Sequence, residues 1–229
     1  MQLTKKYWVD KLGLDWANAL KDVLRDPYME KLMKFLNTEY SKSEIYPDRQ
    51  DVFRAFKMCP FDKMKVVIVG LDPAWTPSPN GLAYGTNSTE TFLGITYSEI
   101  RKRIENDFHN GLCIDFDFTF EKWANQGVLL LNTALTAPKY RTAAHQKPWN
   151  KFTRTVIQAI NDYRPGTVFM FWGEETQYLI SDLKNQDVLV SEHPASAGKQ
   201  YQDWDTEIFK NCNKLLTEKY GEDSTIEWA

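Results

Sequence analysis

The sequence feature that most constrains the fold is a short β-branched run that ends in glycine and is followed by a carboxylate. Residues 65–69 read KVVIV, which is typical of a buried strand. Gly70 ends the run, and Pro73 prevents the strand from continuing past Asp72. Open α/β sheets bind ligands just beyond the carboxyl ends of their strands, so Asp72 lies where catalytic groups are expected. The alternative is that Asp72 only caps the next turn.

Three further apolar runs follow, at residues 127–132, 167–173 and 187–190. Helical patterns lie between these runs, which predicts an α/β fold. We expect a three-layer sandwich, with a central and mostly parallel four-stranded sheet flanked by helices. The length of 229 residues favours a single domain over residues 1–229. The expected helices are two or three within 7–40, and one each at 51–58, 96–108, 121–125, 149–163, 176–184 and 206–220.

Three of the four runs end in a side chain suited to chemistry, namely Asp72, Asn132 and His193. In a parallel sheet the carboxyl ends of the strands share one edge, so we expect the three side chains to meet in one cleft. Each residue alone also has a plainer explanation. Asn132 would then lie in a turn, and His193 would be a buried, hydrogen-bonded imidazole.

The composition of the chain indicates its cellular compartment. Apolar residues make up 42% of the chain, but the longest apolar runs, such as 128–131, are too short to span a bilayer. Residues 1–6 lack the apolar core of a signal peptide. The three cysteines, Cys59, Cys113 and Cys212, form no Cys-x-x-Cys pair, which indicates free buried thiols in a reducing compartment rather than ligands of a metal or cluster. We expect a cytoplasmic monomer, nuclear if the source has a nucleus, without a membrane partner.

The net charge of −3 speaks against a nucleic-acid partner, but the distribution of charge does not. Residues 122–161 contain no Asp or Glu. A one-signed segment can form a local phosphate-attracting face, or it can be a solvated helix surface. The basic residues of this segment are Lys122, Lys139, Arg141, Lys147, Lys151 and Arg154.

Three motifs at the ends of the predicted strands resemble those of the uracil-DNA glycosylases. The water-activating motif of that family, GQDPYH, corresponds to GLDPAW at residues 70–75. Its base-reading motif, LLLN-x-x-LT, corresponds to LLLNTALT at residues 129–136, and its HPSPLS loop to HPASAG at residues 193–198. The likeness runs in order from about residue 16 to residue 228, which is nearly the whole chain.

The resemblance implies a monofunctional enzyme that flips a pyrimidine out of DNA, hydrolyses its N-glycosidic bond and leaves an abasic site without a metal or cofactor. By the family pattern, Asp72 would orient the attacking water and stabilise positive charge on the sugar. A neutral His193 would donate a hydrogen bond to the base O2, where negative charge develops. Asn132 would bind O4 and N3 of the uracil ring. Tyr84 would stack on the base, where the family usually has Phe.

Two changes within residues 70–75 concern the base pocket. Leu71 stands where the family has Gln. In the family this position makes a contact through its backbone, so we expect the change of side chain to be tolerated. Ala74 replaces the tyrosine that lies against C5 of uracil in the family and excludes the methyl group of thymine. The resulting void is either refilled by Trp75 or by a residue of the 84–96 loop, or it accommodates a substituent at C5 of the natural substrate. That substituent would be a methyl, a hydroxymethyl or a bulkier group.

Other departures affect the grip on DNA. Ala195 and Ala144 replace phosphate-contacting serines of the family, and Ala197 replaces the leucine that wedges into the duplex. These losses favour substrates that are already unstacked, such as single strands. Phe92 or Leu93 would supply a substitute wedge. The remaining expected DNA contacts are Lys139, Arg141, His145, Lys147, Ser196 and Ala197.

Two functions from different classes therefore remain. The first is a DNA glycosylase acting on uracil or a C5-substituted pyrimidine in single- or double-stranded DNA, which the retained Asp72, Asn132 and His193 favour. The second is a non-catalytic module of the same fold that binds DNA or a protein, for example a viral replication accessory protein. The lost serines, the lost wedge and the acidic charge favour the second.

Overall fold

The parallel sheet predicted from the four apolar runs is present in the structure, which is a computed structural model. The structure describes residues 3–75, 78–90, 93–112, 114–200, 204 and 207–229. The sheet has the order β3-β2-β5-β6, and all three strand pairs are parallel. Gly70 lies opposite Asn132, and Trp172 lies opposite Ser191. The strands are β2 (Val66–Gly70), β3 (Val128–Asn132), β5 (Val168–Trp172) and β6 (Asp187–Ser191).

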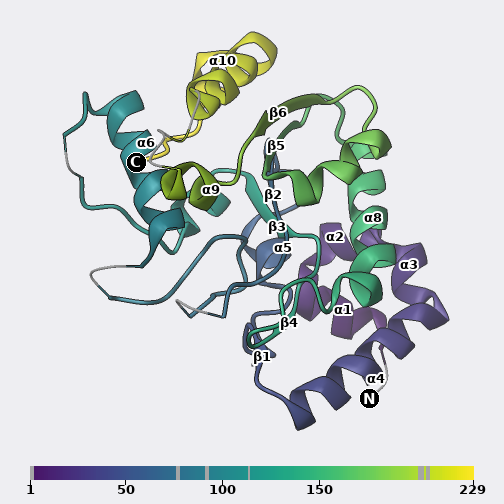
Figure 1. Cartoon of the computed structure of the whole chain (residues 1–229). Helices are drawn as coiled ribbons and strands as arrows, with labels where there is room; N and C mark the ends of the chain where they lie inside the picture. The colour runs from purple at the N-terminus through teal and green to yellow at the C-terminus, as the bar shows by residue number, and fades with distance from the viewer. Residues whose placement is uncertain (1–2, 76–77, 91–92, 113, 201–203, 205–206) are drawn as a thin grey trace.

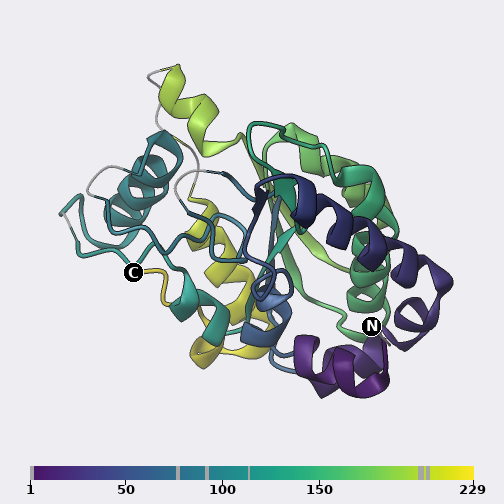
Figure 2. The same cartoon turned by 90° about the horizontal axis from the view of Figure 1, so that it is seen from below.

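Helices cover both faces of the sheet, as the sandwich prediction requires (Figures 1 and 2). On one side lies α8 (Gln146–Tyr163), next to the N-terminal helices, and on the other side lies α10 (Ile208–Tyr220) with α6 (Ile95–Phe108). No helix within the described ranges is long and apolar enough to cross a membrane. The other α-helices are α1 (Lys5–Leu12), α2 (Leu14–Ala19), α3 (Lys21–Arg25), α4 (Pro27–Lys42), α5 (Arg54–Met58), α7 (Glu121–Asn125) and α9 (Pro194–Lys199).

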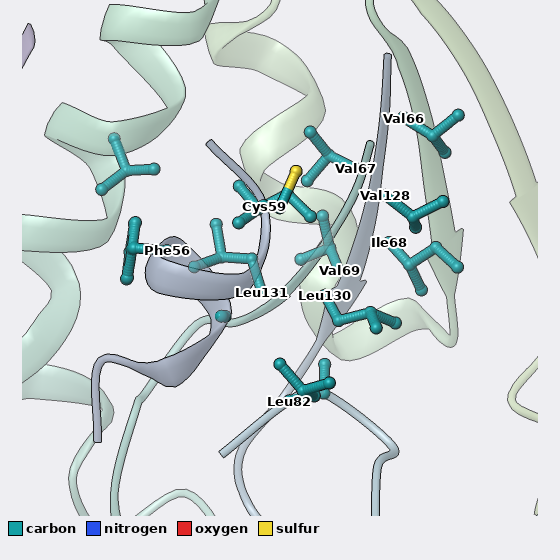
Figure 3. Close-up of a cluster of buried hydrophobic side chains, with 14 of the residues drawn as sticks. Phe56, Cys59, Val66, Val67, Ile68, Val69, Leu82, Val128, Leu130 and Leu131 are labelled. Carbon is teal, nitrogen blue, oxygen red and sulfur yellow. The ribbon is translucent and has the colours of Figure 1, made fainter. Parts of the chain in front are cut away.

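The core is built around the buried strands β2 and β3. Every residue of β2 and β3 is buried, because helices pack on both faces of the sheet. Figure 3 shows Val69 and Leu131 among these buried side chains, with Phe56 packed nearby. Cys59 and Cys212 are free and buried, as predicted, and burial raises the pKa of the Cys59 thiol to about 12. Cys113 lies outside the described residues.

Several helix boundaries differ from the prediction. Helix α6 begins at Ile95, one residue before the predicted start at residue 96, with Gly94 as its N-cap. Gly94 has φ +102°, a conformation that glycine adopts without strain and that brings the chain into the helix one residue earlier. Helix α8 begins at Gln146 rather than at residue 149. Residues 174–182 form a 3₁₀ helix, η1 (Glu174–Asp182), and a second one is η2 (Glu222–Ser224).

A small two-stranded sheet and a short helix were not predicted. Strands β1 (Ile45–Tyr46) and β4 (Ala137–Pro138) pair antiparallel and hold the segment after β3 against the N-terminal part. Helix α9 has Pro194 at its first position, where a fixed φ favours helix initiation. It packs tightly on α6, since a Cβ on Gly198 would lie 2.4 Å from Cγ2 of Ile95.

Candidate active site

The carboxyl edge of the sheet opens into a cleft of about 660 Å³. Asp72, Asn132 and His193 all line it, so the structure brings together the three residues that the strand ends placed at one edge. The walls come from the loop around Tyr84, the first turn of α6, helix α9 and the start of η1. A volume in this range is typical of clefts that hold small molecules, which measure roughly 300 to 1,000 Å³.

Asp72 is held by the backbone of a distant loop. Its Oδ2 accepts a hydrogen bond of 2.6 Å from the N–H of Ala143. Burial raises the pKa of the Asp72 carboxyl, and the hydrogen bond from Ala143 opposes this rise. Among the described residues, Oδ1 has no hydrogen-bond partner and is free to bind a water molecule in the cleft.

His193 is arranged as a neutral hydrogen-bond donor. It caps α9, and its Nδ1 accepts a hydrogen bond of 3.1 Å from the N–H of Ala195. Because Nδ1 is an acceptor, the ring proton of the neutral imidazole is on Nε2. Burial lowers the pKa of His193, Lys199 lowers it further, and Glu175 opposes both. The imidazole is therefore uncharged near neutral pH.

Asn132 offers an unoccupied amide to the cleft. Its side chain is 6% exposed, and no described residue hydrogen-bonds to the amide. The neighbouring strand makes room for it, since a Cβ on Gly70 would lie 2.4 Å from Oδ1 of Asn132. Because the amide lines the cleft and has no partner among the described residues, its donor and acceptor are available to a ligand there.

Tyr84 forms a wall of the cleft and is held in a fixed orientation. Its hydroxyl donates a hydrogen bond of 3.2 Å to the carbonyl of Trp172, and its ring centroid lies 5.9 Å from that of His193. The residue has φ +64°, a left-handed conformation that is unfavourable for a tyrosine. Burial raises the pKa of the hydroxyl, which keeps Tyr84 protonated.

The residue two positions after Asp72 lies at the cleft. Ala74 is exposed and lines the cleft. The ring of Trp75 packs against Tyr140, with centroids 4.6 Å apart, and it leaves Ala74 uncovered. Leu71 also lines the cleft, and its carbonyl accepts a hydrogen bond of 2.7 Å from Thr133 Oγ1.

The expected phosphate contact at His145 was wrong. His145 is 2% exposed, because its ring is buried against Phe35. Its Nδ1 lies 2.8 Å from Thr136 Oγ1, and its Nε2 lies 3.3 Å from Glu39. Both ring nitrogens are thus occupied by the protein, and the side chain stabilises the fold instead of facing DNA.

The expected DNA contact at Ala197 was wrong as well. Ala197 is 1% exposed, because α9 turns its side chain towards the core. Ser196, one residue earlier, is exposed and lines the cleft. Of the two proposed substitute wedges, Leu93 lines the cleft, and Phe92 lies outside the described residues.

The basic segment is partly neutralised by acids from other parts of the chain. Lys139 pairs with Glu44 at 2.9 Å. Lys151 pairs with Asp26, and Arg154 with Asp182. Lys122, Arg141 and Lys147 are exposed and form no ion pair with a described residue, so within the described part of the chain they are the unpaired cations of this segment.

The sequence interpretation missed four residues of the site or its rim, namely Trp172, Glu175, Lys199 and Tyr140. The first three line the cleft, and Tyr140 contacts Trp75 at its edge. Trp172 closes an apolar strand, which was a usable signal, but the other three lie in segments without periodicity. In the described part of the chain, no three His, Cys, Asp or Glu side chains group closely enough to hold a metal ion.

Comparison with known proteins gives one consistent answer. Residues 56–217 match the model of the family described as the uracil DNA glycosylase superfamily. The uracil-DNA glycosylase of Pseudomonas syringae pv. syringae is 37% identical over 193 residues, which cover 81% of each chain. That of Phocaeicola vulgatus is 34% identical over 217 residues, covering 93% of this chain and 96% of the relative.

Solved structures agree on the fold. The crystal structure of mimivirus uracil-DNA glycosylase matches with a TM-score of 0.80 at 19% identity, covering 93% of this chain and 86% of that chain. The UNG structure from Nitratifractor salsuginis matches with a TM-score of 0.62 at 17% identity, covering 96% and 95%.

Proposed function

Because this chain belongs to the uracil DNA glycosylase superfamily and is a DNA glycosylase that hydrolyses N-glycosyl bonds, we propose that its cleft accepts both uracil and pyrimidines that carry a substituent at C5. The observation that carries the proposal is the open position at Ala74, next to Asp72 in a cleft of about 660 Å³. The DNA-binding but non-catalytic alternative would not need the arrangement of Asp72 and His193 described above.

Asp72 is proposed to act on the sugar side of the scissile bond. One of its oxygens is fixed by the N–H of Ala143, which leaves the other to orient a water molecule. Its negative charge would stabilise the positive charge that develops on the sugar as the bond to the base breaks. Because one carboxylate oxygen is already held by a hydrogen bond, the side chain is pre-oriented and needs little reorganisation during the reaction.

His193 is proposed to act on the base side. With Nδ1 occupied by Ala195, the proton on Nε2 is available to the oxygen O2 of a base in the cleft. A donor aimed at an oxygen that gains negative charge strengthens as the base leaves, and this difference between ground state and transition state is what accelerates the reaction. No proton has to leave the ring.

Asn132 and Tyr84 are proposed to select the pyrimidine. The free amide of Asn132 can pair with an acceptor and a donor on the Watson–Crick edge of a uracil ring. The Tyr84 ring, fixed by its hydrogen bond to Trp172, presents an aromatic face on which a flipped base can stack. These contacts concern O4, N3 and the ring face, so they leave C5 free.

Ala74 is proposed to determine what C5 carries. A methyl side chain in an exposed position leaves space next to the ring, and the Trp75 side chain is engaged with Tyr140 instead of filling it. A methyl or hydroxymethyl group would enter this space without a clash. Hydrophobic discrimination between a base and its methylated form is worth only about 1 to 3 kcal/mol, so removing one blocking ring is sufficient to change the preference.

Arg141, Lys147 and Ser196 are the proposed contacts to the DNA backbone, since they are exposed and the two cations are unpaired among the described residues. Lys139 contributes less, because Glu44 already neutralises it. With Ala197 buried, α9 carries no wedge at that position, which favours single-stranded or disrupted substrates. We further propose that the enzyme acts as a monomer.

The test is base release from matched single- and double-stranded oligonucleotides that carry uracil, thymine or 5-hydroxymethyluracil. We expect the wild-type protein to release all three bases, and the Asp72→Asn protein, with strongly reduced release, is the control. Release of uracil alone would contradict the C5 proposal while leaving the glycosylase activity in place. No release of any base would contradict the proposed site.

A further inference from the structure

An exposed aromatic pair stands at the rim of the cleft. The rings of Trp75 and Tyr140 have centroids 4.6 Å apart and an interplanar angle of 61°. Trp75 is 39% exposed and Tyr140 is 70% exposed, so each keeps much of its surface in solvent. Trp75 also lines the cleft, which makes the pair continuous with the site where the target base would lie.

Tyr140 occupies a turn position that disfavours it. The N–H of Arg141 donates to the carbonyl of Pro138, which closes a turn with Tyr140 at its third position. Tyr140 has φ +60°, a conformation that turns usually reserve for glycine or asparagine. A bulky residue there is strained, and such strain commonly persists where the side chain is used.

The surroundings of the pair suit a nucleic acid. Arg141 follows Tyr140 directly, is exposed and forms no ion pair with a described residue. The Nζ atom of Lys139 lies 5.5 Å from the centre of the Tyr140 ring. The same loop is tied to the catalytic carboxylate, since the N–H of Ala143 binds Asp72. Exposed aromatics beside cations form the usual composition of sites that stack single-stranded bases.

We propose that Trp75 and Tyr140 form a stacking platform for an unpaired base one nucleotide away from the target. The platform replaces the hold that a wedge from α9 would give, because Ala197 is buried. The inference rests on the proposed function only in placing the target nucleotide in the cleft. It is independent of which base is excised.

The platform is tested by binding of a single-stranded oligonucleotide that contains a tetrahydrofuran abasic analogue with 2-aminopurine as its neighbour. Stacking on the platform changes the emission of 2-aminopurine. We expect Tyr140→Ala to abolish that change and to weaken binding about 5- to 150-fold, the range for one stacked base. Tyr140→Phe keeps the ring and should bind like the wild type.

Tyr163→Ala is the matched control, because Tyr163 is 67% exposed and ends α8, at the opposite edge of the sheet. Tyr140→Gly separates binding from folding, since φ +60° suits glycine, and the variant should melt no lower than the wild type while binding weakly. Wild-type binding and emission with Tyr140→Ala would overturn the proposal. The probe has no target base, so failure of the C5 proposal would not affect this result.

Discussion

The Oδ2 atom of Asp72 lies 2.6 Å from the backbone nitrogen of Ala143, a residue 71 positions further along the chain. Ala143 holds φ +63°, so a strained backbone position presents the N–H to the carboxylate. The proposed catalytic carboxylate is therefore positioned by a main-chain N–H, which mutation of a side chain cannot remove. This contact also joins the loop that carries Tyr140 and Arg141 to the end of β2.

Replacing Asp72 by asparagine should remove the charge and keep the geometry, because an amide oxygen can still accept the bond from Ala143. We expect base release to fall by about 100- to 1,000-fold, the usual loss for one electrostatic group in a transition state. The affinity for an oligonucleotide with an abasic analogue should be unchanged. Comparable losses of rate and affinity would contradict a purely electrostatic role for Asp72.

Activity should be constant around neutral pH and fall in acid. The proposed mechanism needs ionised Asp72 and neutral His193, and both lose these states as the pH decreases. Burial raises the pKa of Asp72 and lowers the pKa of His193 below its ordinary value of 6.5. The two pKa values are therefore closer together than usual, and the loss of activity should occur in acid. The measurement is kcat/KM for uracil release against pH, and a decrease that begins above pH 7 would contradict it.

Two charged residues of the cleft should shift the acidic side of the pH–activity profile (the acid limb) in opposite directions. Glu175 raises the pKa of His193, so Glu175→Gln should lower that pKa and shift the limb to lower pH. Lys199 lowers it, so Lys199→Met should shift the limb to higher pH. Both side chains are exposed, so the shifts will be small and largest at low salt. Shifts in the same direction would show that His193 does not control the limb.

Gly70→Ala should damage base recognition more than the fold. The added Cβ would lie 2.4 Å from Oδ1 of Asn132 and would force that amide out of place. We expect kcat/KM to fall by roughly 10- to 200-fold, which corresponds to about 1 to 3 kcal/mol of lost recognition. A melting curve measures the effect on β2, and an unchanged kcat/KM would mean that Asn132 does not read the base.

The salt dependence of DNA affinity should distinguish residues that contact phosphates from a residue that only stabilises the fold. Arg141→Ala and Lys147→Ala should each reduce the slope of log Kd against log salt concentration by about one, since each cation contacts one phosphate. His145→Ala should leave this slope unchanged. It should instead lower the unfolding free energy by about 1 to 3 kcal/mol, because Thr136 and Glu39 lose a buried partner. A reduced slope for His145→Ala would contradict its structural role.

The sequence predicted the parts of this fold that depend on local pattern. The strands β2, β3 and β5 are buried along their whole length, so their apolar runs were visible without any alignment. The strand ends then located Asp72, Asn132 and His193 at one edge. Helix α9 was missed because it has only six residues and depends on its contact with α6.

The errors came from contacts between distant segments. His145 is buried by Glu39 and Phe35, which lie about a hundred residues earlier in the chain. No residue near His145 in the sequence indicates that its side chain is buried. The acid-free segment suggested a basic face, yet Lys151 and Arg154 find their acids at Asp26 and Asp182. The exposed pair of Trp75 and Tyr140 likewise joins two loops that only the fold brings together.

The central claim is that Ala74 admits a substituent at C5, and the most direct measurement compares Ala74→Tyr with the wild type. The quantity is the ratio of kcat/KM for 5-hydroxymethyluracil to that for uracil, in single-stranded DNA of one sequence. We predict that the tyrosine lowers this ratio by at least about tenfold while uracil release continues, because the ring refills the space beside C5. An equal ratio in both proteins, or a wild type that releases only uracil, would contradict the claim.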